Sequence, residues 1–173
     1  MPNYCDYIMK VVGDKSQCLK FLDKLESYEE PNHFWRIFEV NVDDMTVADN
    51  NETAMYISGY CAWSIETCCR AGGYSGGVDL FSVNTKELHL VLEAYSREPG
   101  YAFEEHYLYN NGECLEDARE DIICFLWDRD EYQTYEDFKL SCPSNLEVPP
   151  EEDFVDDEVI VGGFGEEFGK WHI

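Results

Sequence analysis

The chain has 173 residues, of which 37 are Asp or Glu and 12 are Lys or Arg, giving a formal net charge of −25. Such a surface repels phosphate backbones and anionic lipid, so we exclude direct binding to nucleic acid or to a membrane. Aromatic residues make up 15% of the chain, unlike in acidic disordered proteins, so we expect a folded core. No apolar run approaches the roughly 20 residues needed to cross a bilayer, and no signal peptide is evident, so we expect a soluble, cytoplasmic protein.

The first elements follow from local signals. Residues 4–12 alternate loosely and predict a strand, and Asp14 is a candidate helix N-cap. The next apolar residues fall at i, i+3, i+4, i+7 and i+10, on one face of a predicted helix: Cys18, Phe21, Leu22, Leu25 and Tyr28. Strands are expected over 34–43 and 53–63, and Ser64 is a candidate cap for a short helix over 65–70.

A hairpin is predicted next. Residues 87–95 alternate, Glu98-Pro99-Gly100 indicates a turn, and 101–109 form the returning strand. In this register Glu93 faces Glu104, with His106 diagonal to them. A metal or acid–base site is one interpretation of the three residues; a solvated sheet face, or an edge covered by the C-terminal part, is the favoured one.

The last third is acidic. Residues 98–173 contain 22 of the 37 acids and 4 of the 12 bases. A helical stripe predicts a second amphipathic helix with acids on its other faces: Leu115, Ala118, Ile122, Phe125 and Leu126. An aromatic and acidic extension follows, in which 155–161 is a candidate edge strand and 162–165 a flexible segment.

The order of elements suggests an α+β fold, a ferredoxin-like antiparallel sheet with helices on one face. Four sets of residues sharpen this expectation: the opening Met1-Pro2-Asn3-Tyr4-Cys5, then Ala62-Trp63-Ser64, then Tyr95 with Gly100 and Phe103, and last Tyr109-Asn110-Asn111-Gly112. They resemble motifs of the YubB-like ferredoxin-fold family of plasmid and phage proteins. The resemblance covers residues 1–113 and implies a ferredoxin-like domain from a mobile element in a bacterial host; residues 114–173 are the acidic helix and an extension packed on that domain.

Catalytic and cofactor motifs are not evident. The four histidines lack the spacing of a zinc motif, the eight cysteines form no C-x-x-C pair, and we expect reduced thiols. The segment from Asp128 has Gln133 where a calcium loop needs Gly, and the glycines of 71–77 lack a phosphate-binding fingerprint. We therefore expect a protein without enzymatic activity, cofactor or metal.

The charge itself is the leading functional signal. A folded acidic surface can imitate nucleic acid and occupy the basic groove of a CRISPR effector or restriction enzyme. This hypothesis predicts an anti-CRISPR or anti-restriction inhibitor; the alternative is an accessory protein that binds a partner without mimicry. Candidate aromatic anchors are Tyr132, Tyr135, Phe138, Phe154, Phe164 and Trp171. The candidate contact residues are Glu113, Glu116, Asp117, Glu120, Asp121, Asp128, Asp130, Glu131, Glu136, Asp137, Glu151, Glu152, Asp153, Asp156, Asp157 and Glu158.

Overall fold

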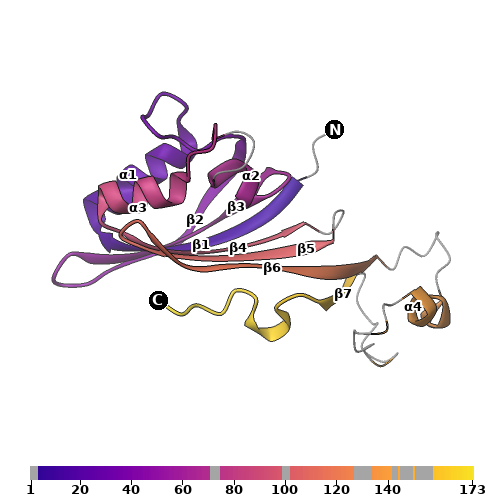
Figure 1. Cartoon of the computed structure of the whole chain (residues 1–173). Coiled ribbons are helices and arrows are strands. Elements are labelled where there is room, and N and C mark those ends of the chain that lie inside the picture. Colours follow the sequence, from indigo (N-terminus) through magenta and orange to yellow (C-terminus); the bar gives the residue numbers. More distant parts are fainter. Residues whose placement is uncertain are drawn as a thin grey trace.

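The computed structural model describes residues 4–70, 75–98, 102–126, 134–141, 144, 150 and 158–173, with the backbone alone at 123–126, 138, 141 and 158–161. It is a mixed α/β chain built on an antiparallel sheet in the order β2-β3-β1-β4-β5-β6-β7 (Figure 1). The strands are β1 Tyr4–Asp14, β2 Ile37–Val47, β3 Glu52–Ala62, β4 Val91–Glu98, β5 Phe103–Asn110, β6 Glu113–Leu126 and β7 Glu158–Gly162. The first six form one continuous sheet, and β7 pairs with the far part of β6, from Ile122 to Leu126.

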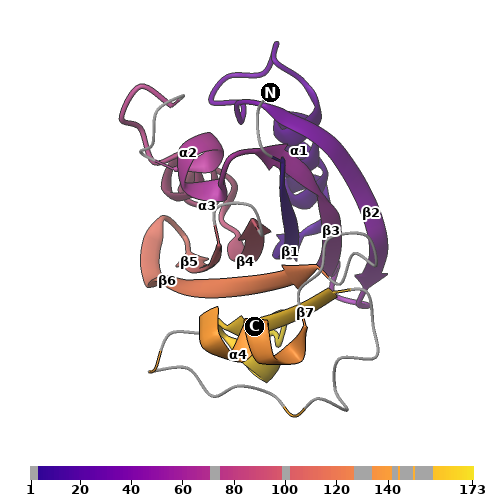
Figure 2. The same cartoon turned by 90° about the vertical axis from the view of Figure 1, so that its right-hand side faces the viewer.

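Two layers cover the two faces of this sheet. The helices α1 Lys15–Glu26, α2 Ile65–Cys69 and α3 Leu80–Leu88 lie on one face, and the C-terminal segment, which we define as residues 163–173, lies on the other (Figures 1 and 2). A short helix, α4 Tyr135–Ser141, precedes β7. No helix in the described part of the chain is both long enough and apolar enough to span a bilayer.

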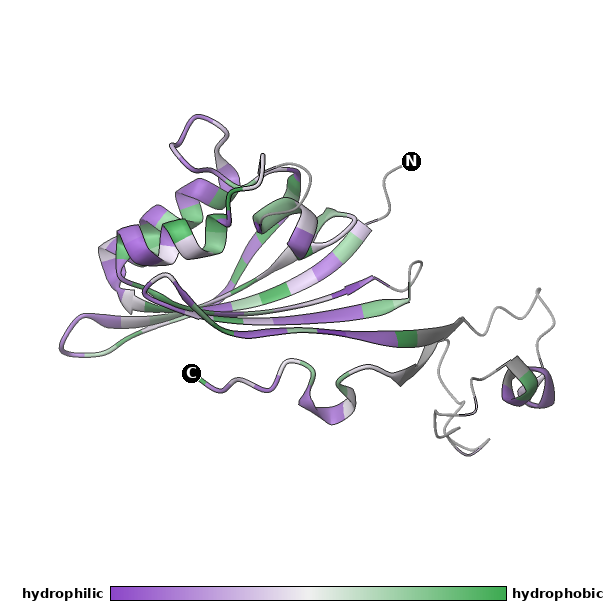
Figure 3. Cartoon of the chain, viewed as in Figure 1, coloured by the Kyte–Doolittle hydropathy of each residue, from purple (hydrophilic) through white to green (hydrophobic). Residues whose placement is uncertain are grey.

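The main core lies between the sheet and the three helices. On β1, Cys5, Tyr7, Met9 and Val11 are buried, and the residues between them point to the other face. Figure 3 shows hydrophobic and hydrophilic residues interspersed along the strands of the sheet. As predicted, Asp14 caps α1, accepting the backbone N–H of Ser16 at 2.9 Å. Ser64 likewise caps α2, accepting the backbone N–H of Thr67 at 3.0 Å.

Six cysteines have described side chains, and all six are free thiols, as expected. Burial raises the pKa of the Cys18 thiol to about 11, so this side chain behaves as a small apolar core residue. One thiol is exposed and the other five are buried: Cys114, then Cys5, Cys18, Cys61, Cys68 and Cys69.

The predicted second amphipathic helix is wrong, because residues 113–126 form strand β6. Asn111 and Gly112 are the two residues between β5 and β6, and both have positive φ, 48° and 91°. This is the conformation of a tight hairpin turn, which Asn-Gly favours. The turn directs the chain back along β5, so pairing with that strand overrides the helical spacing of the apolar residues.

The register predicted for the β4–β5 hairpin is also wrong. Glu93 lies opposite Leu108, and Glu104 lies opposite Arg97. The reversal falls two residues later than predicted because β4 continues to Glu98, which pairs with Phe103. The first residues of the predicted strand belong instead to α3, a helix capped by Asp79 that the sequence analysis missed.

Candidate functional site

An open, acidic sheet edge is the first candidate site. From Glu113 to Asp121, β6 pairs with β5, and no second strand of the described residues pairs with this stretch, because β7 begins to pair at Ile122. Five of the predicted contact residues lie in this stretch and all are exposed: Glu113, Glu116, Asp117, Glu120 and Asp121. We call this stretch the β6 edge.

The acids of the β6 edge point to both faces of the sheet. Asp117 lies on the helix side and accepts a hydrogen bond from Arg70 at 2.9 Å. Glu116 lies on the opposite side, where it lines a cavity with residues of the C-terminal segment. The β6 edge is therefore a ribbon of negative charge rather than the face of a helix.

Acidity at a sheet edge also has a structural explanation. The opposite edge strand, β2, carries exposed Glu39, Asp43 and Asp44. Charged side chains on edge strands prevent two sheets from pairing edge to edge. The β6 edge differs from β2 in its density of acids, with five acids and one base, Arg119, in nine residues.

The other predicted contact residues are not brought to this edge by described structure. Glu136 and Asp137 are exposed on α4, and Glu158 begins β7 with its side chain undescribed. Two of the predicted aromatic anchors, Phe164 and Trp171, pack within the protein, where each ring contacts the ring of Tyr95. The remaining acids lie outside the described residues: Asp128, Asp130, Glu131, Glu151, Glu152, Asp153, Asp156 and Asp157.

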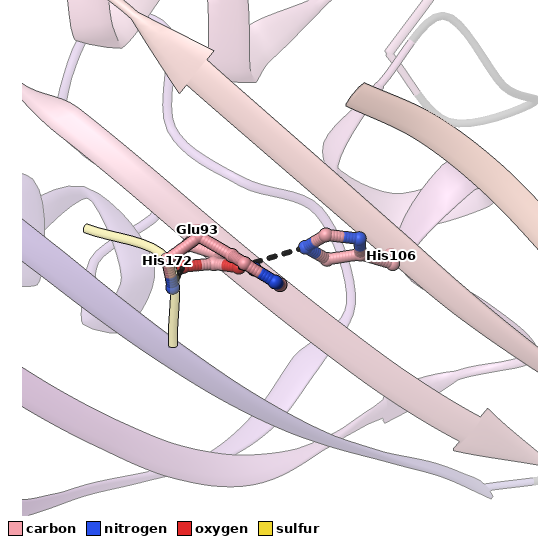
Figure 4. Close-up of side chains that lie close together, drawn as sticks. All are labelled: Glu93, His106 and His172. Carbon is pink, nitrogen blue, oxygen red and sulfur yellow. Dashed lines mark hydrogen bonds and ion pairs between the residues drawn. The ribbon is translucent and has the colours of Figure 1, made fainter. Parts of the chain in front are cut away.

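A buried carboxylate with two histidines is the second candidate site (Figure 4). Glu93 of β4 has no exposed surface, and its Oε1 lies 2.9 Å from His106 Nε2 and 2.6 Å from His172 Nδ1. The other oxygen, Oε2, accepts the backbone N–H of His172 at 2.7 Å. We call Glu93, His106 and His172 the Glu–His cluster.

Aromatic packing holds this cluster in place. The Tyr95 ring stacks on the His106 imidazole with centroids 4.1 Å apart and planes 9° from parallel. The Tyr95 hydroxyl donates to the carbonyl of Lys170 at 2.9 Å, and Tyr95 also contacts the rings of Phe168 and Trp171. These contacts fix the C-terminal segment across β4 and β5, which sets the position of His172.

The electrostatics of Glu93 favour its charged form. Burial raises the pKa of the carboxyl, but the hydrogen bonds from His172 and His106 outweigh burial and lower the pKa below its usual value. The carboxylate therefore stays ionised in a buried position, where the hydrogen bonds from the two histidines offset the cost of burying it.

Two more buried carboxylates flank the Glu–His cluster. Glu104 is paired with Arg97 and accepts the backbone N–H of Phe164 at 2.7 Å, which anchors the start of the C-terminal segment. Glu105, on the helix side, accepts hydrogen bonds from Ser96 and from the backbone of Ile65. Its Oε1 forms no hydrogen bond, and burial raises its pKa despite an ion-pair distance of 3.5 Å to Arg119.

A cavity of about 390 Å³ opens beside the two histidines. Two carboxylates, Glu116 of the β6 edge and Glu167 of the C-terminal segment, stand in its wall together with apolar and aromatic residues. The cavity therefore gives a small ligand or water access to the Glu–His cluster.

The sequence partly anticipated this cluster. The predicted hairpin has Glu93 and His106 diagonal to each other, as the structure does. The favoured interpretation was a solvated sheet face or an edge covered by the C-terminal part; the C-terminal segment does cover these strands, but they lie inside the sheet and not at its edge. Glu104 was wrongly placed beside them, because of the register error. His172 was missed, since no local pattern connects a residue in an irregular segment with a distant hairpin.

Comparison with protein-family models, curated proteins and solved structures finds no match for this chain. Its function must therefore be argued from its own residues.

Proposed function

We propose that the protein acts by binding, through the β6 edge, a partner whose surface is strongly basic. The observation that carries this proposal is the run of five exposed acids, with one base among them, on a strand edge to which no other strand in the described part of the chain pairs. A complementary charge field accelerates encounter and rejects partners of the wrong sign.

The partner is proposed to be a nucleic-acid-binding protein. A β-strand rises about 3.3 Å per residue, so the nine residues of the β6 edge span about 26 Å. One strand of DNA carries a phosphate about every 3.4 Å, or about eight over that length. Five carboxylates and Arg119 leave four net negative charges over the same length, about half of that charge, which a basic groove can accept in place of a phosphate backbone.

The proposed biological role is inhibition of a host defence protein, such as a CRISPR effector or a restriction enzyme. This step rests on the resemblance to the YubB-like family and the mobile-element origin it implies.

The strand order β2-β3-β1-β4, with helices following β1 and β3, supports the proposal that this part is a ferredoxin-like unit, to which β5, β6 and β7 are added.

Binding to a purified CRISPR effector–guide complex and to a purified restriction endonuclease tests the proposal. We expect affinity for one of them to fall steeply with added salt and in the presence of excess DNA or RNA. Binding that persists in high salt and beside excess nucleic acid would support the alternative, an accessory protein that binds without mimicry. Absence of binding to both probes at low salt contradicts the proposed role in defence.

Two matched variants locate the contact. Neutralising Glu113, Glu116, Glu120 and Asp121 to Gln or Asn removes four charges from the β6 edge and leaves the Arg70–Asp117 pair intact. With about 0.5–1 kcal/mol for each exposed charge, affinity should fall by roughly 30-fold or more. The control neutralises four exposed acids at α1, Asp23, Glu26, Glu29 and Glu30, and changes the net charge equally. Equal losses in both variants would show that net charge, not the β6 edge, determines binding.

A further inference from the structure

The geometry points to a transition-metal site at the Glu–His cluster, and we propose that Glu93, His106 and His172 bind a zinc ion. Three candidate ligand atoms, one from each residue, all lie within 4.8 Å of one another. Zinc bonds to histidine nitrogen and carboxylate oxygen at about 2.0–2.2 Å, which places tetrahedral ligand atoms about 3.3 Å apart. The present separations of 2.6 and 2.9 Å from Glu93 Oε1 need only a small outward movement to admit the ion.

The three ligand side chains differ in how freely they can move, and the most exposed of them permits this adjustment. Glu93 is fully buried, and the His106 side chain is held by the stacked ring of Tyr95. The His172 side chain is 49% exposed, so its ring can adjust without disturbing the core. Zinc binding requires a free lone pair on His106 Nε2 and His172 Nδ1, so the ring proton of each neutral histidine must move to the other nitrogen.

The surroundings favour a cation independently of the ligand distances. An ionised carboxylate without exposed surface is costly unless positive charge lies beside it. Beside Glu93, this positive charge would come from the metal. The backbone N–H of His172 would keep the other carboxylate oxygen, Oε2, in its orientation. Among the described residues that line the adjacent cavity there are two more carboxylates, Glu116 and Glu167, and no Lys or Arg.

The ligand set defines the type of site. Two histidines and one carboxylate leave a coordination position open, as in catalytic zinc sites and unlike closed structural ones. The cavity provides room for water or a ligand group at that position. The site would also tie the C-terminal segment to β4 and β5, so metal binding and docking of that segment are coupled.

Titration of metal-free protein with ZnCl2, followed by calorimetry and thermal unfolding, tests the site. We expect one zinc ion per chain and a Tm increase of roughly 5–10 °C at a free concentration 100-fold above Kd. His172→Gln should weaken zinc binding more than tenfold, since changes even outside the ligand set cost that much. Because His172 is half exposed, this variant should fold, and Glu93→Gln adds a second test if it folds.

Matched controls separate this site from other zinc ligands. His89→Gln changes an exposed histidine bonded to Asn111, away from the Glu–His cluster, and should leave affinity unchanged. Cys114→Ser removes the exposed thiol and should also have no effect. Cobalt substitution should give tetrahedral d–d absorption without a thiolate charge-transfer band. The proposal would be overturned if the protein does not bind zinc, if His172→Gln binds zinc as tightly as wild type, or if Cys114→Ser loses zinc binding.

Discussion

Replacing Gly163 by Ala should detach the C-terminal segment from the sheet. Gly163 has a φ of +65°, and a Cβ there would lie 2.2 Å from Glu104 Oε2 and 2.6 Å from Ile122 Cγ2. Glu104 cannot move aside easily, because it is buried and bonded to Arg97 and to the backbone of Phe164. The added methyl group must therefore displace the Phe164 N–H from its carboxylate partner.

The expected cost has two parts. Placing Ala in the left-handed region costs about 1–2 kcal/mol. Losing a hydrogen bond to a buried, charged carboxylate adds about 1.5–3 kcal/mol. The free energy of docking the segment should therefore fall by about 2.5–5 kcal/mol, and by less only if the segment undocks completely at a lower cost.

Gly165→Ala is the matched control. Gly165 also has a positive φ, +54°, but a Cβ there meets no atom within 4 Å. Only the backbone cost of about 1–2 kcal/mol applies to it. The difference in docking free energy between Gly163→Ala and Gly165→Ala therefore measures the cost of the contact with Glu104.

Amide hydrogen exchange measures this difference where it arises. The amides of Phe164 and His172, which donate to Glu104 and Glu93, should exchange much faster in Gly163→Ala than in Gly165→Ala. Amides of α1, on the opposite face, should be unchanged. Equal exchange in the two variants would refute the contact between Gly163 and Glu104 as the feature that docks the segment.

Two further predictions concern the helix side of the sheet. Burial raises the pKa of Glu105, so its charged form destabilises the folded state. The variant Glu105→Gln should therefore have a higher free energy of unfolding than the wild type, and the difference should grow as the pH rises above 4.5. Urea unfolding from pH 4 to pH 8 measures this difference, and the exposed substitution Glu113→Gln is the control. A stability difference between Glu105→Gln and wild type that shrinks as pH rises would contradict the prediction. Phe81→Ala should lower that free energy by about 3–5 kcal/mol, because Phe81 is fully buried between the rings of Phe34 and Tyr109. Phe81→Leu should cost clearly less, and equal losses would argue against a close-packed core at this point.

Local signals in the sequence predicted the elements that depend on neighbouring residues alone. Asp14 begins α1 and Ser64 begins α2 because each side chain satisfies backbone N–H groups one turn away. The alternation on β1 predicted a strand because its apolar side must face a core. These predictions needed no knowledge of what lies across the sheet.

The error at β6 shows where local patterns compete. The apolar residues from Leu115 to Leu126 have helical spacing, but Asn111-Gly112 is a strong hairpin signal directly before them. This Asn-Gly turn indicates that a paired strand follows, and pairing with β5 prevails over the helical spacing. The acids of this segment consequently lie along an edge, on both faces of the sheet, rather than around a helix.

The net charge of −25, its concentration after residue 97, and the first strands and helices can be predicted without a structure, because composition and short-range spacing are properties of the chain. The exposure or burial of each acid, in contrast, depends on how the strands pack in three dimensions. The predicted hairpin already put Glu93 and His106 diagonal to each other on adjacent strands. The tertiary structure alone brought His172 to them, because after β7 the chain, with positive φ at Gly162 and Gly163, runs across the other face of the sheet (Figure 1). The Glu–His cluster depends on pairing and packing between distant segments, which no local pattern specifies.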